Sequence, residues 1–401
     1  MRTSIGTALA TGTDGRKVGS EAAASALADL PTDRVDFCQV FCSIEYEYEG
    51  VLEGIREIVG TDAALIGCST ASAFTEREVA EGAVAVSLVT SDTLTFVTGF
   101  GTGLRENVSR AVREAVEDFP AAVDGYPYLS AINLHDGLSS VGEELALVTQ
   151  QKLGPTVSIV GGSAADDHQL EATHVFHDDT VARDAVVLAL IASKERPIVS
   201  VRHGHEPLSD PVEVTRSAGS DVFELDGKPA FEVWKDAVRE PVREEFGVEI
   251  DDLEAGDQLL QRIMCEFEFG IDQGEGRYKM RWPWVEDDYQ VLRFALDIPE
   301  GTVFRVMHGA SDAQIESARE AAETAAEKAE TEGSGIAGAF VYDCACRGIV
   351  LGEEFPVAVE AIADELEVPF VGFETYGEMC MGLGQFSGFH NTTTVILLLP
   401  E

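Results

Sequence analysis

The sequence has few basic residues. Lysine and arginine together number 28 among 401 residues, and only seven of them are lysine, whereas aspartate and glutamate number 72. The formal net charge at pH 7 is therefore -44. A surface of this sign repels phosphate backbones and anionic lipid headgroups. We therefore expect neither nucleic acid nor a membrane surface among the direct partners of the protein.

The sequence also lacks long apolar runs and a paired set of cysteines. No stretch approaches the roughly 20 consecutive apolar residues that a membrane-spanning helix needs, and residues 1–10 do not have the layout of a signal peptide. The seven cysteines are an odd number without a regular spacing, which is typical of reduced thiols. These absences predict a cytoplasmic protein.

The chain instead carries acid along its whole length, together with intensely apolar segments such as residues 185–191. Such segments argue against disorder. Excess carboxylate with scarce lysine indicates a cytosol rich in salt, where ions screen the self-repulsion, so we expect a halophilic, haloarchaeal source. A chain of 401 residues allows two domains, because single hydrophobic cores stop growing near roughly 250–300 residues.

One order of elements occurs three times: strand, helix, strand, helix, strand, glycine turn and strand. Copies two and three keep one offset, since Gly372 minus Gly162, Leu397 minus Val187 and position 303 minus position 93 all give 210. Self-similarity at so long a period indicates duplicated half-domains. The predicted elements span residues 3–10, 19–30, 35–42, 48–59, 63–67 and 83–89 in copy one; 93–99, 105–119, 129–134, 139–153, 156–160 and 185–191 in copy two; and 302–307, 312–330, 336–342, 355–366, 369–371 and 393–399 in copy three.

Alternating strands and helices predict right-handed parallel crossovers, and hence an α/β fold with mostly parallel sheets from three duplicated βαβαββ units. Ser311 with Gln314 predicts a capping box at the start of the third copy's long helix. Residues 192–300 break the pattern with prolines and with predicted strands at 263–269 and 291–298, which predicts an antiparallel insertion in the second domain. We place the two domains at residues 1–215 and 216–401.

Polar side chains follow the ends of the predicted parallel strands. Ligands of parallel sheets bind beyond these ends, where helix N-termini direct amide donors into the cleft. The third copy has the richest set, which suits a small zwitterionic or carboxylate-bearing ligand. The candidate ligand-binding residues are Cys68, Ser69, Gly162, Ser163, Asp343, Cys344, Cys346, Arg347, Tyr376, Glu378, His390 and Asn391.

Short motifs at these positions keep the order and spacing of a known family. The motifs are Gly67-Cys68-Ser69-Thr70, Gly161-Gly162-Ser163-Ala164-Ala165-Asp166, Val214-Thr215-Arg216, Cys344-Ala345-Cys346-Arg347-Gly348, Gly372-Phe373, Tyr376-Gly377-Glu378 and His390-Asn391-Thr392. Together they resemble a FIST protein, with an N-terminal FIST domain followed by a C-terminal one. The resemblance implies an intracellular sensor in signal transduction that binds small ligands such as amino acids. We find no output module of the kind often joined to FIST proteins, so we expect a separate output protein or homo-oligomerisation to pass on the signal.

The charges of the candidate residues predict their roles. Arg347 is expected to hold the ligand carboxylate, and Glu378 or Asp343 to take an ammonium group. The expected neutral hydrogen-bond partners are Ser69, Ser163, His390 and Asn391. A structural alternative stays open, in which Arg347 pairs with Asp343 or Glu378 only to lock the loop. The glycines at the strand exits, Gly162 among them, could likewise serve only to allow positive φ.

An enzymatic alternative is a cysteine-dependent hydrolase or transferase that uses Cys344 or Cys346. A neighbouring Arg347 would lower the thiol pKa and His390 would accept its proton, but no recognised catalytic signature accompanies them. A zinc site from these two cysteines with Cys380 and His390 lacks the usual Cys-x2-Cys spacing. A scaffold with an empty pocket is a third alternative. We expect no catalytic residue, no cofactor and no metal.

Overall fold

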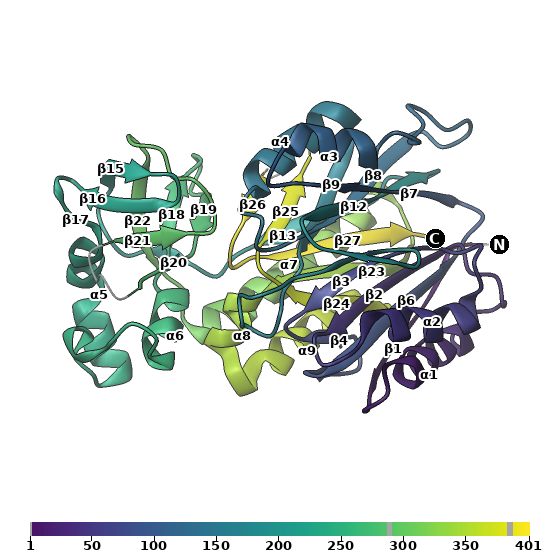
Figure 1. Cartoon of the computed structure of the whole chain (residues 1–401), viewed down its shortest axis with the longest axis horizontal. Helices are drawn as coiled ribbons and strands as arrows, with labels where there is room; N and C mark the ends of the chain where they lie inside the picture. The colour runs from purple at the N-terminus through teal and green to yellow at the C-terminus, as the bar shows by residue number, and fades with distance from the viewer. Residues whose placement is uncertain (1, 287–290, 383–387) are drawn as a thin grey trace.

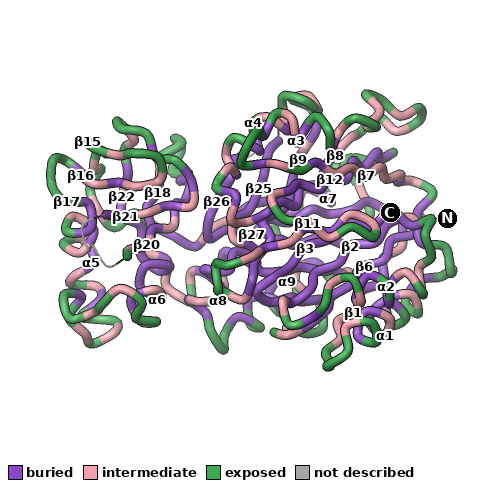
Figure 2. The backbone as a smooth tube through the Cα atoms, viewed as in Figure 1, coloured by how far each residue is buried: buried purple, intermediate pink, exposed green. Residues whose placement is uncertain are grey.

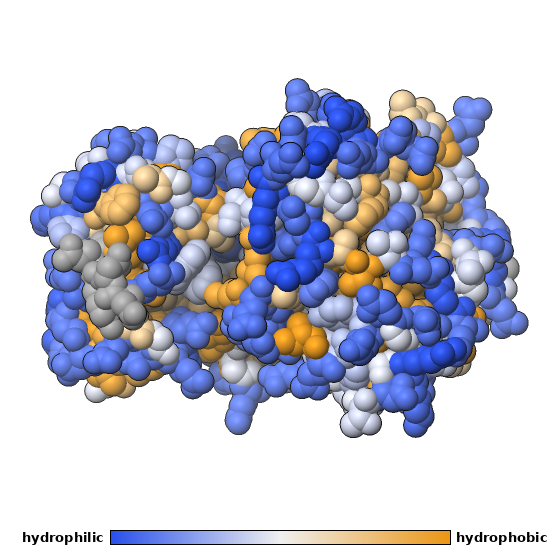
Figure 3. Space-filling view, in the orientation of Figure 1, coloured by the Kyte–Doolittle hydropathy of each residue, from blue (hydrophilic) through white to orange (hydrophobic). Residues whose placement is uncertain are grey.

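The computed structural model describes residues 2–286, 291–382 and 388–401. Figure 1 shows two lobes, a large lobe that contains both chain ends and a smaller lobe built from residues 206–308. The chain ends lie side by side, joined by an ion pair between Arg2 and Glu401. Hydrophilic side chains cover most of the face visible in Figure 3. Among the described residues, no helix combines the length and the apolar character needed to cross a membrane.

The large lobe contains three sheets with one strand order. Each sheet contains one set of four strands. Across the sheet, the first strand of the set is followed by the fourth, then the second and then the third, which gives β1-β6-β2-β3, β7-β12-β8-β9 and β13-β27-β23-β24. The strands are β1 Ser4–Thr11, β2 Phe37–Ser43, β3 Ala64–Thr70 and β6 Ala83–Thr90; β7 Leu94–Thr102, β8 Tyr128–His135, β9 Ser158–Ser163 and β12 Ala185–Ser193; and β13 Ile198–Arg202, β23 Ile336–Cys344, β24 Phe370–Thr375 and β27 Thr394–Pro400. The shared order agrees with a threefold repeat, while its origin by duplication stays a prediction.

The prediction of mostly parallel sheets is wrong. Within the described residues, each of the three sheets has a single parallel pair, β2 with β3, β8 with β9 and β23 with β24. The last strand of each set runs back between the first and second strands and is antiparallel to both. The two strand–helix–strand connections of each set still bring the carboxyl ends of its first three strands to one edge of the sheet. The fold is therefore mixed α/β, and most neighbouring strands are antiparallel.

Short hairpins tie the three sheets together. In each set a hairpin leaves between the third and last strands and pairs with the third strand of a neighbouring sheet, so that β4 joins β24, β10 joins β3 and β25 joins β9. The hairpin strands are β4 Ala73–Thr75, β5 Val79–Ala80, β10 Val175–His177, β11 Thr180–Ala182, β25 Glu378–Met381 and β26 Gly388–His390. This cyclic exchange covers one edge of every sheet, and it brings the three sets of strand ends together.

A common core fills the space between the three sheets. Phe41 stacks on Phe373 with ring centroids 4.2 Å apart, and Gln39 Nε2 donates to the Tyr342 hydroxyl at 3.2 Å. Pairs of helices pack on the outer faces through separate apolar clusters, and Figure 2 shows the buried strands inside this layer. The helices are α1 Gly15–Ala28, α2 Tyr48–Val59, α3 Val108–Ala115, α4 Gly142–Leu153, α7 Ser311–Glu332, α8 Ala345–Leu351 and α9 Phe355–Leu366.

The small lobe is the antiparallel insertion, and two element predictions for this region are wrong. Residues 302–307 do not open the third set, because β22 (Val303–His308) pairs inside the small-lobe sheet and β13 takes the first position. Residues 263–269 are not one strand, because helix α6 (Gln258–Glu266) buries Leu260, Ile263 and Met264 at helical spacing. The remaining elements are β14 Glu206–Pro207, β15 Val212–Ala218, β16 Asp221–Leu225, β17 Lys228–Pro229, α5 Ala230–Phe246, β18 Phe269–Asp272, β19 Tyr278–Arg281, β20 Pro283–Trp284 and β21 Leu292–Phe294.

Candidate functional site

A cavity of about 310 Å³ lies where the small lobe meets the large one. Its floor comes from the carboxyl ends of β8, β9, β23 and β24, and its outer wall comes from α6 and β20. The lining residues are Gly137, Leu138, Ser140, His168, Leu170, Gln261, Trp282, Trp284, Glu286, Ala295, Cys344, Ala345, Cys346, Ile349, Thr375, Tyr376 and Asn391. Strand ends from the second and third sets therefore converge on one hollow, whereas Cys68 and Ser69 of the first set lie outside its lining.

A buried aspartate shapes the loop that follows β9. Asp166 is 2% exposed, and its carboxylate accepts the backbone N–H groups of residues 170–172 at 2.7–2.9 Å and the Tyr376 hydroxyl at 2.5 Å. Next to it, Asp167 and His168 hold positive φ angles of 50° and 60°, which non-glycine residues adopt at a cost. The carboxylate thus holds a strained loop so that His168 reaches the cavity.

Tryptophans of the small lobe form the opposite wall. Trp282 and Trp284 stack with ring centroids 5.3 Å apart. The strand directly before them, β19, is anchored to α4 of the large lobe, because Lys279 Nζ and Arg281 Nη2 lie 2.9 Å and 3.0 Å from the two carboxylate oxygens of Glu143. This cluster is largely buried, so it fixes the position of the aromatic wall over the strand ends.

The cavity is poor in charge. Among the described residues that line it there is no lysine or arginine, and Glu286 is the one acid. Burial raises the pKa of Glu374 and of Glu378 to about 8, and it raises the pKa of Glu268 well above its usual value. Glu374 and Glu378, which are buried outside the lining, are therefore mainly protonated at neutral pH, and the lining is mainly aromatic and hydrogen-bonding.

Two thiols belong to the lining. Cys344 and Cys346 reach the cavity, and they cluster with Cys265 of α6 behind the wall. Burial raises the pKa of both lining thiols well above the usual range. They are therefore protonated thiols at neutral pH, which makes them weak nucleophiles.

Arg347 does not line the cavity. Its side chain is fully buried, and four of the five guanidinium N–H groups are used inside the protein. Nε donates to Asp343 Oδ1 at 2.7 Å, Nη1 donates to Gln314 Oε1 at 2.7 Å and Ser317 Oγ at 2.9 Å, and Nη2 donates to the Gln314 carbonyl at 2.9 Å. The predicted contact of Arg347 with a ligand carboxylate thus has no support in this geometry, which favours the structural alternative.

The other candidate residues divide into two groups. Cys344, Cys346, Tyr376 and Asn391 line the cavity. The remaining residues are buried outside the lining, and these are Cys68, Ser69, Gly162, Ser163, Asp343, Glu378 and His390. Several brace the floor: Glu378 Oε2 accepts the Thr393 hydroxyl at 2.8 Å, Thr394 Oγ1 donates to Asp343 Oδ2 at 2.6 Å, and the Ser163 N–H donates to the Gly377 carbonyl at 2.8 Å.

The reason for glycine at position 162 differs from the predicted one. Gly162 does not have positive φ. Instead, a Cβ at this position would lie 2.6 Å from Cγ2 of Thr375, because β25 and the end of β24 pack closely against β9. Glycine here allows two sheets to approach, and the prediction of a positive-φ turn at Gly162 is wrong.

The sequence reasoning missed the small-lobe wall and the loops after β8 and β9. Trp282, Trp284, Gln261 and His168 were not among the candidates. A signal was present, since the segment Trp282-Pro283-Trp284 holds two of the three tryptophans of the chain. Its association with the strand ends depends on contacts between segments at least 60 residues apart, which the local pattern does not contain.

A larger groove of about 760 Å³ lies at the opposite end of β8. It is lined mainly by residues 121–130 and by the segment around Pro197. None of the predicted site residues borders it. The smaller cavity brings together the strand ends and the aromatic wall, so we take it as the candidate functional site.

Fold and cavity define a mixed α/β protein with an open hollow between two lobes as its candidate site. Two family models match nearly the whole chain, the FIST N domain over residues 36–228 and the FIST C domain over residues 230–381. The chain therefore belongs to the FIST family, whose domains are in general sensor domains of signal transduction.

Three individual proteins of known sequence or structure are similar to this chain at low identity. An uncharacterised protein of Methanocaldococcus jannaschii is 24% identical over 200 residues, which cover 47% of this chain and 38% of that protein. A cyanuric acid hydrolase from A. caulinodans is similar with a TM-score of 0.29 and 12% identity, over 48% of this chain and 72% of that one. A second cyanuric acid hydrolase structure has a TM-score of 0.34 and 9% identity, and each chain is covered to 100%. Likeness at this level carries no argument about function.

Proposed function

We propose that this protein is a signal-transduction sensor that binds an amino acid or a related carboxylate metabolite in the cavity between its lobes. The observation that carries the proposal is the convergence of two sets of strand ends and the tryptophan wall on one hollow of about 310 Å³, near the lower limit for small-molecule sites. Residues 1–215 and 216–401 act as one binding unit, because both contribute lining residues.

The lining favours recognition through an aromatic or apolar side chain and an amino group. An ammonium group is attracted to the faces of Trp282 and Tyr376. A ligand carboxylate meets neutral donors in place of Arg347. Asn391 Oδ1 faces the backbone N–H of Trp282 at 3.4 Å, so its amide nitrogen is the group that can donate to a ligand.

The proposal also covers the setting of the sensor. We place it in the cytoplasm, because all seven cysteines are free thiols, and in a cell with a salt-rich cytosol, because a net charge of -44 needs screening. The signal passes to a separate output protein or through a homo-oligomer.

A cysteine-dependent hydrolase or transferase is the second candidate, and it has one observation in its favour. Cys344 and Cys346 both reach the cavity. The raised pKa of both thiols weakens this candidate, because a nucleophilic cysteine needs its thiolate. Binding without turnover therefore fits the cavity better.

A thermal-shift screen tests the proposal. Amino acids, the matching amines and the matching carboxylic acids are compared, since ligand binding raises apparent stability by mass action. We expect amino acids with apolar or aromatic side chains to raise the melting temperature, amines to retain more of the effect than acids, and Asn391→Ala to reduce it. The matched control is Gln151→Ala, which removes an exposed amide at the far end of α4. No stabilising ligand in any class, or an unchanged shift in Asn391→Ala, would contradict the proposal.

A further inference from the structure

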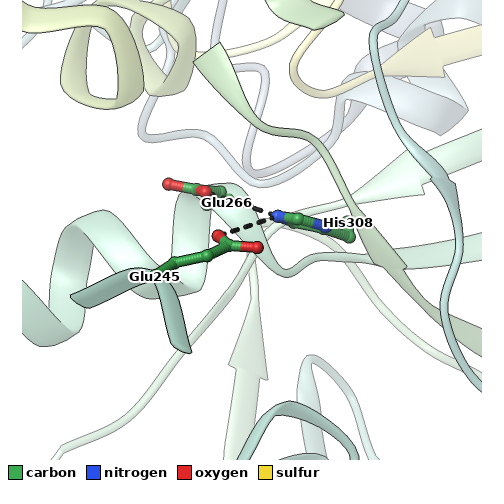
Figure 4. A group of neighbouring side chains, drawn as sticks. All are labelled: Glu245, Glu266 and His308. Carbon is green, nitrogen blue, oxygen red and sulfur yellow. Dashed lines mark hydrogen bonds and ion pairs between the residues drawn. The ribbon is translucent and has the colours of Figure 1, made fainter. Parts of the chain in front are cut away.

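Three side chains of the small lobe meet away from the cavity. Glu245 from α5, Glu266 at the end of α6 and His308 at the end of β22 place one ligand-type atom each within 4.8 Å of one another. Figure 4 shows the His308 ring nitrogen facing both carboxylates. His308 Nε2 lies 3.2 Å from Glu245 Oε2 and 3.4 Å from Glu266 Oε1.

These separations match the edges of a metal coordination tetrahedron. With metal–ligand bonds of about 2.0–2.1 Å, two ligand atoms of a tetrahedral zinc site stand roughly 3.3–3.5 Å apart. The His308 ring is already held in place, because it stacks on Phe267 with centroids 4.5 Å apart and an interplanar angle of 2°. A cation between the three groups would therefore need little rearrangement of the histidine.

An unpaired buried oxygen gives independent support. Glu266 is 4% exposed, and its Oε2 atom has no hydrogen-bond partner. A buried carboxylate oxygen without a partner is costly, and a second bond to a cation would remove that cost. Glu245 is exposed at the same place, so an ion can enter from solvent.

We propose that Glu245, Glu266 and His308 form a binding site for a divalent transition-metal ion, with zinc as the best fit. One imidazole nitrogen, one oxygen of Glu245 and both oxygens of Glu266 would give zinc four ligand atoms. The ion would join α5, α6 and β22. Because α6 also carries Gln261 of the cavity wall, the metal would stiffen the small-lobe side of the cavity.

Calorimetric titration of zinc chloride into metal-free, untagged protein tests the site. We expect one ion per chain in the wild type and at least about tenfold weaker binding in Glu245→Gln and Glu266→Gln, since even outer partners of metal ligands contribute 10–100-fold to affinity. The matched control is Glu244→Gln, which makes the same charge change on the neighbouring, exposed residue of α5 and should bind like the wild type.

Cobalt substitution adds a spectroscopic readout. Tetrahedral cobalt gives strong visible absorption, which should appear in the wild type and in Glu244→Gln and disappear in Glu245→Gln. Folding of every variant is checked by circular dichroism, and Glu245→Gln changes an exposed side chain. The proposal is overturned if no saturable binding occurs, or if zinc binds Glu245→Gln and Glu266→Gln as tightly as the wild type, in which case the three groups are only an ion triad. The amino-acid screen is independent of this result.

Discussion

The start of α8 divides two regions with opposite chemistry. On one side, Arg347 and Asp343 form a closed network with Gln314 and Ser317, and every partner is buried. On the other side, Cys346, one residue earlier, borders an open hollow with neutral and aromatic walls. The charged residues Arg347 and Asp343 of this edge are thus engaged within the fold, while the proposed ligand site is lined mainly by uncharged groups.

Arg347→Met should have the largest effect of any change in this comparison. It leaves the Asp343 carboxylate buried without its cation, and breaking a buried pair in this way costs about 3–5 kcal/mol. Chemical denaturation should show that loss in the free energy of unfolding, while the ligand-induced shift of the folded variant persists. Asp343→Asn added to Arg347→Met should restore part of the stability. A small loss of stability together with loss of ligand binding would instead indicate that Arg347 contacts the ligand.

Glu378→Gln should have an intermediate effect that depends on pH. Burial raises the Glu378 pKa to about 8, above the value of about 4.3 in an unfolded chain. The folded state therefore holds a proton that the unfolded state has lost, so the stability from this group is complete below about pH 4 and decreases as pH rises towards 8.

Melting curves and denaturation between pH 6 and pH 9 measure this effect. The wild type should lose on the order of 2–3 kcal/mol more than Glu378→Gln over that interval. Glu374 titrates in both proteins and serves as the internal control. Parallel pH profiles for the two proteins would show that Glu378 is charged in the folded state.

Cys346→Ser should have the smallest effect. A protonated thiol and a hydroxyl are both small neutral groups, so we expect ligand affinity to change by less than about threefold. Iodoacetamide labelling at pH 7, followed by mass spectrometry, should show no fast modification of Cys344 or Cys346, because burial raises the pKa of both thiols. Rapid alkylation of one of them would favour the hydrolase or transferase instead.

Periodicity predicted most of the large lobe. The helix predicted at 48–59 has the observed bounds Tyr48–Val59, and most predicted strands overlap the observed ones. Strand order was not predictable in this way, because a last strand inserted between two others makes the same local pattern as one added at a sheet edge. The offset of 210 residues gave a wrong prediction at position 303. A strand does begin there, but it belongs to the sheet of the small lobe and not to the third set.

The candidate site was predicted in outline only. Placement after strand ends identified Cys344, Cys346, Tyr376 and Asn391, because the parallel pairs do share an edge. The prediction that Ser311 and Gln314 form a capping box is wrong: α7 has Ala310 as its N-cap without a side-chain bond, and Gln314 instead accepts from Arg347. A sequence shows that a polar group exists, but its partner depends on tertiary packing.

Tryptophan fluorescence tests most directly whether the neutral hollow is the ligand site. The chain has three tryptophans, of which Trp282 and Trp284 line the cavity and Trp234 is buried in the small-lobe core with its indole N–H donating to the Phe267 carbonyl at 2.8 Å. A ligand that raises the melting temperature should change the emission of the wild type and of Trp234→Phe, and it should leave the emission of the Trp282→Phe/Trp284→Phe double variant unchanged. An emission change that persists in the double variant and disappears in Trp234→Phe would place the ligand elsewhere and contradict the account.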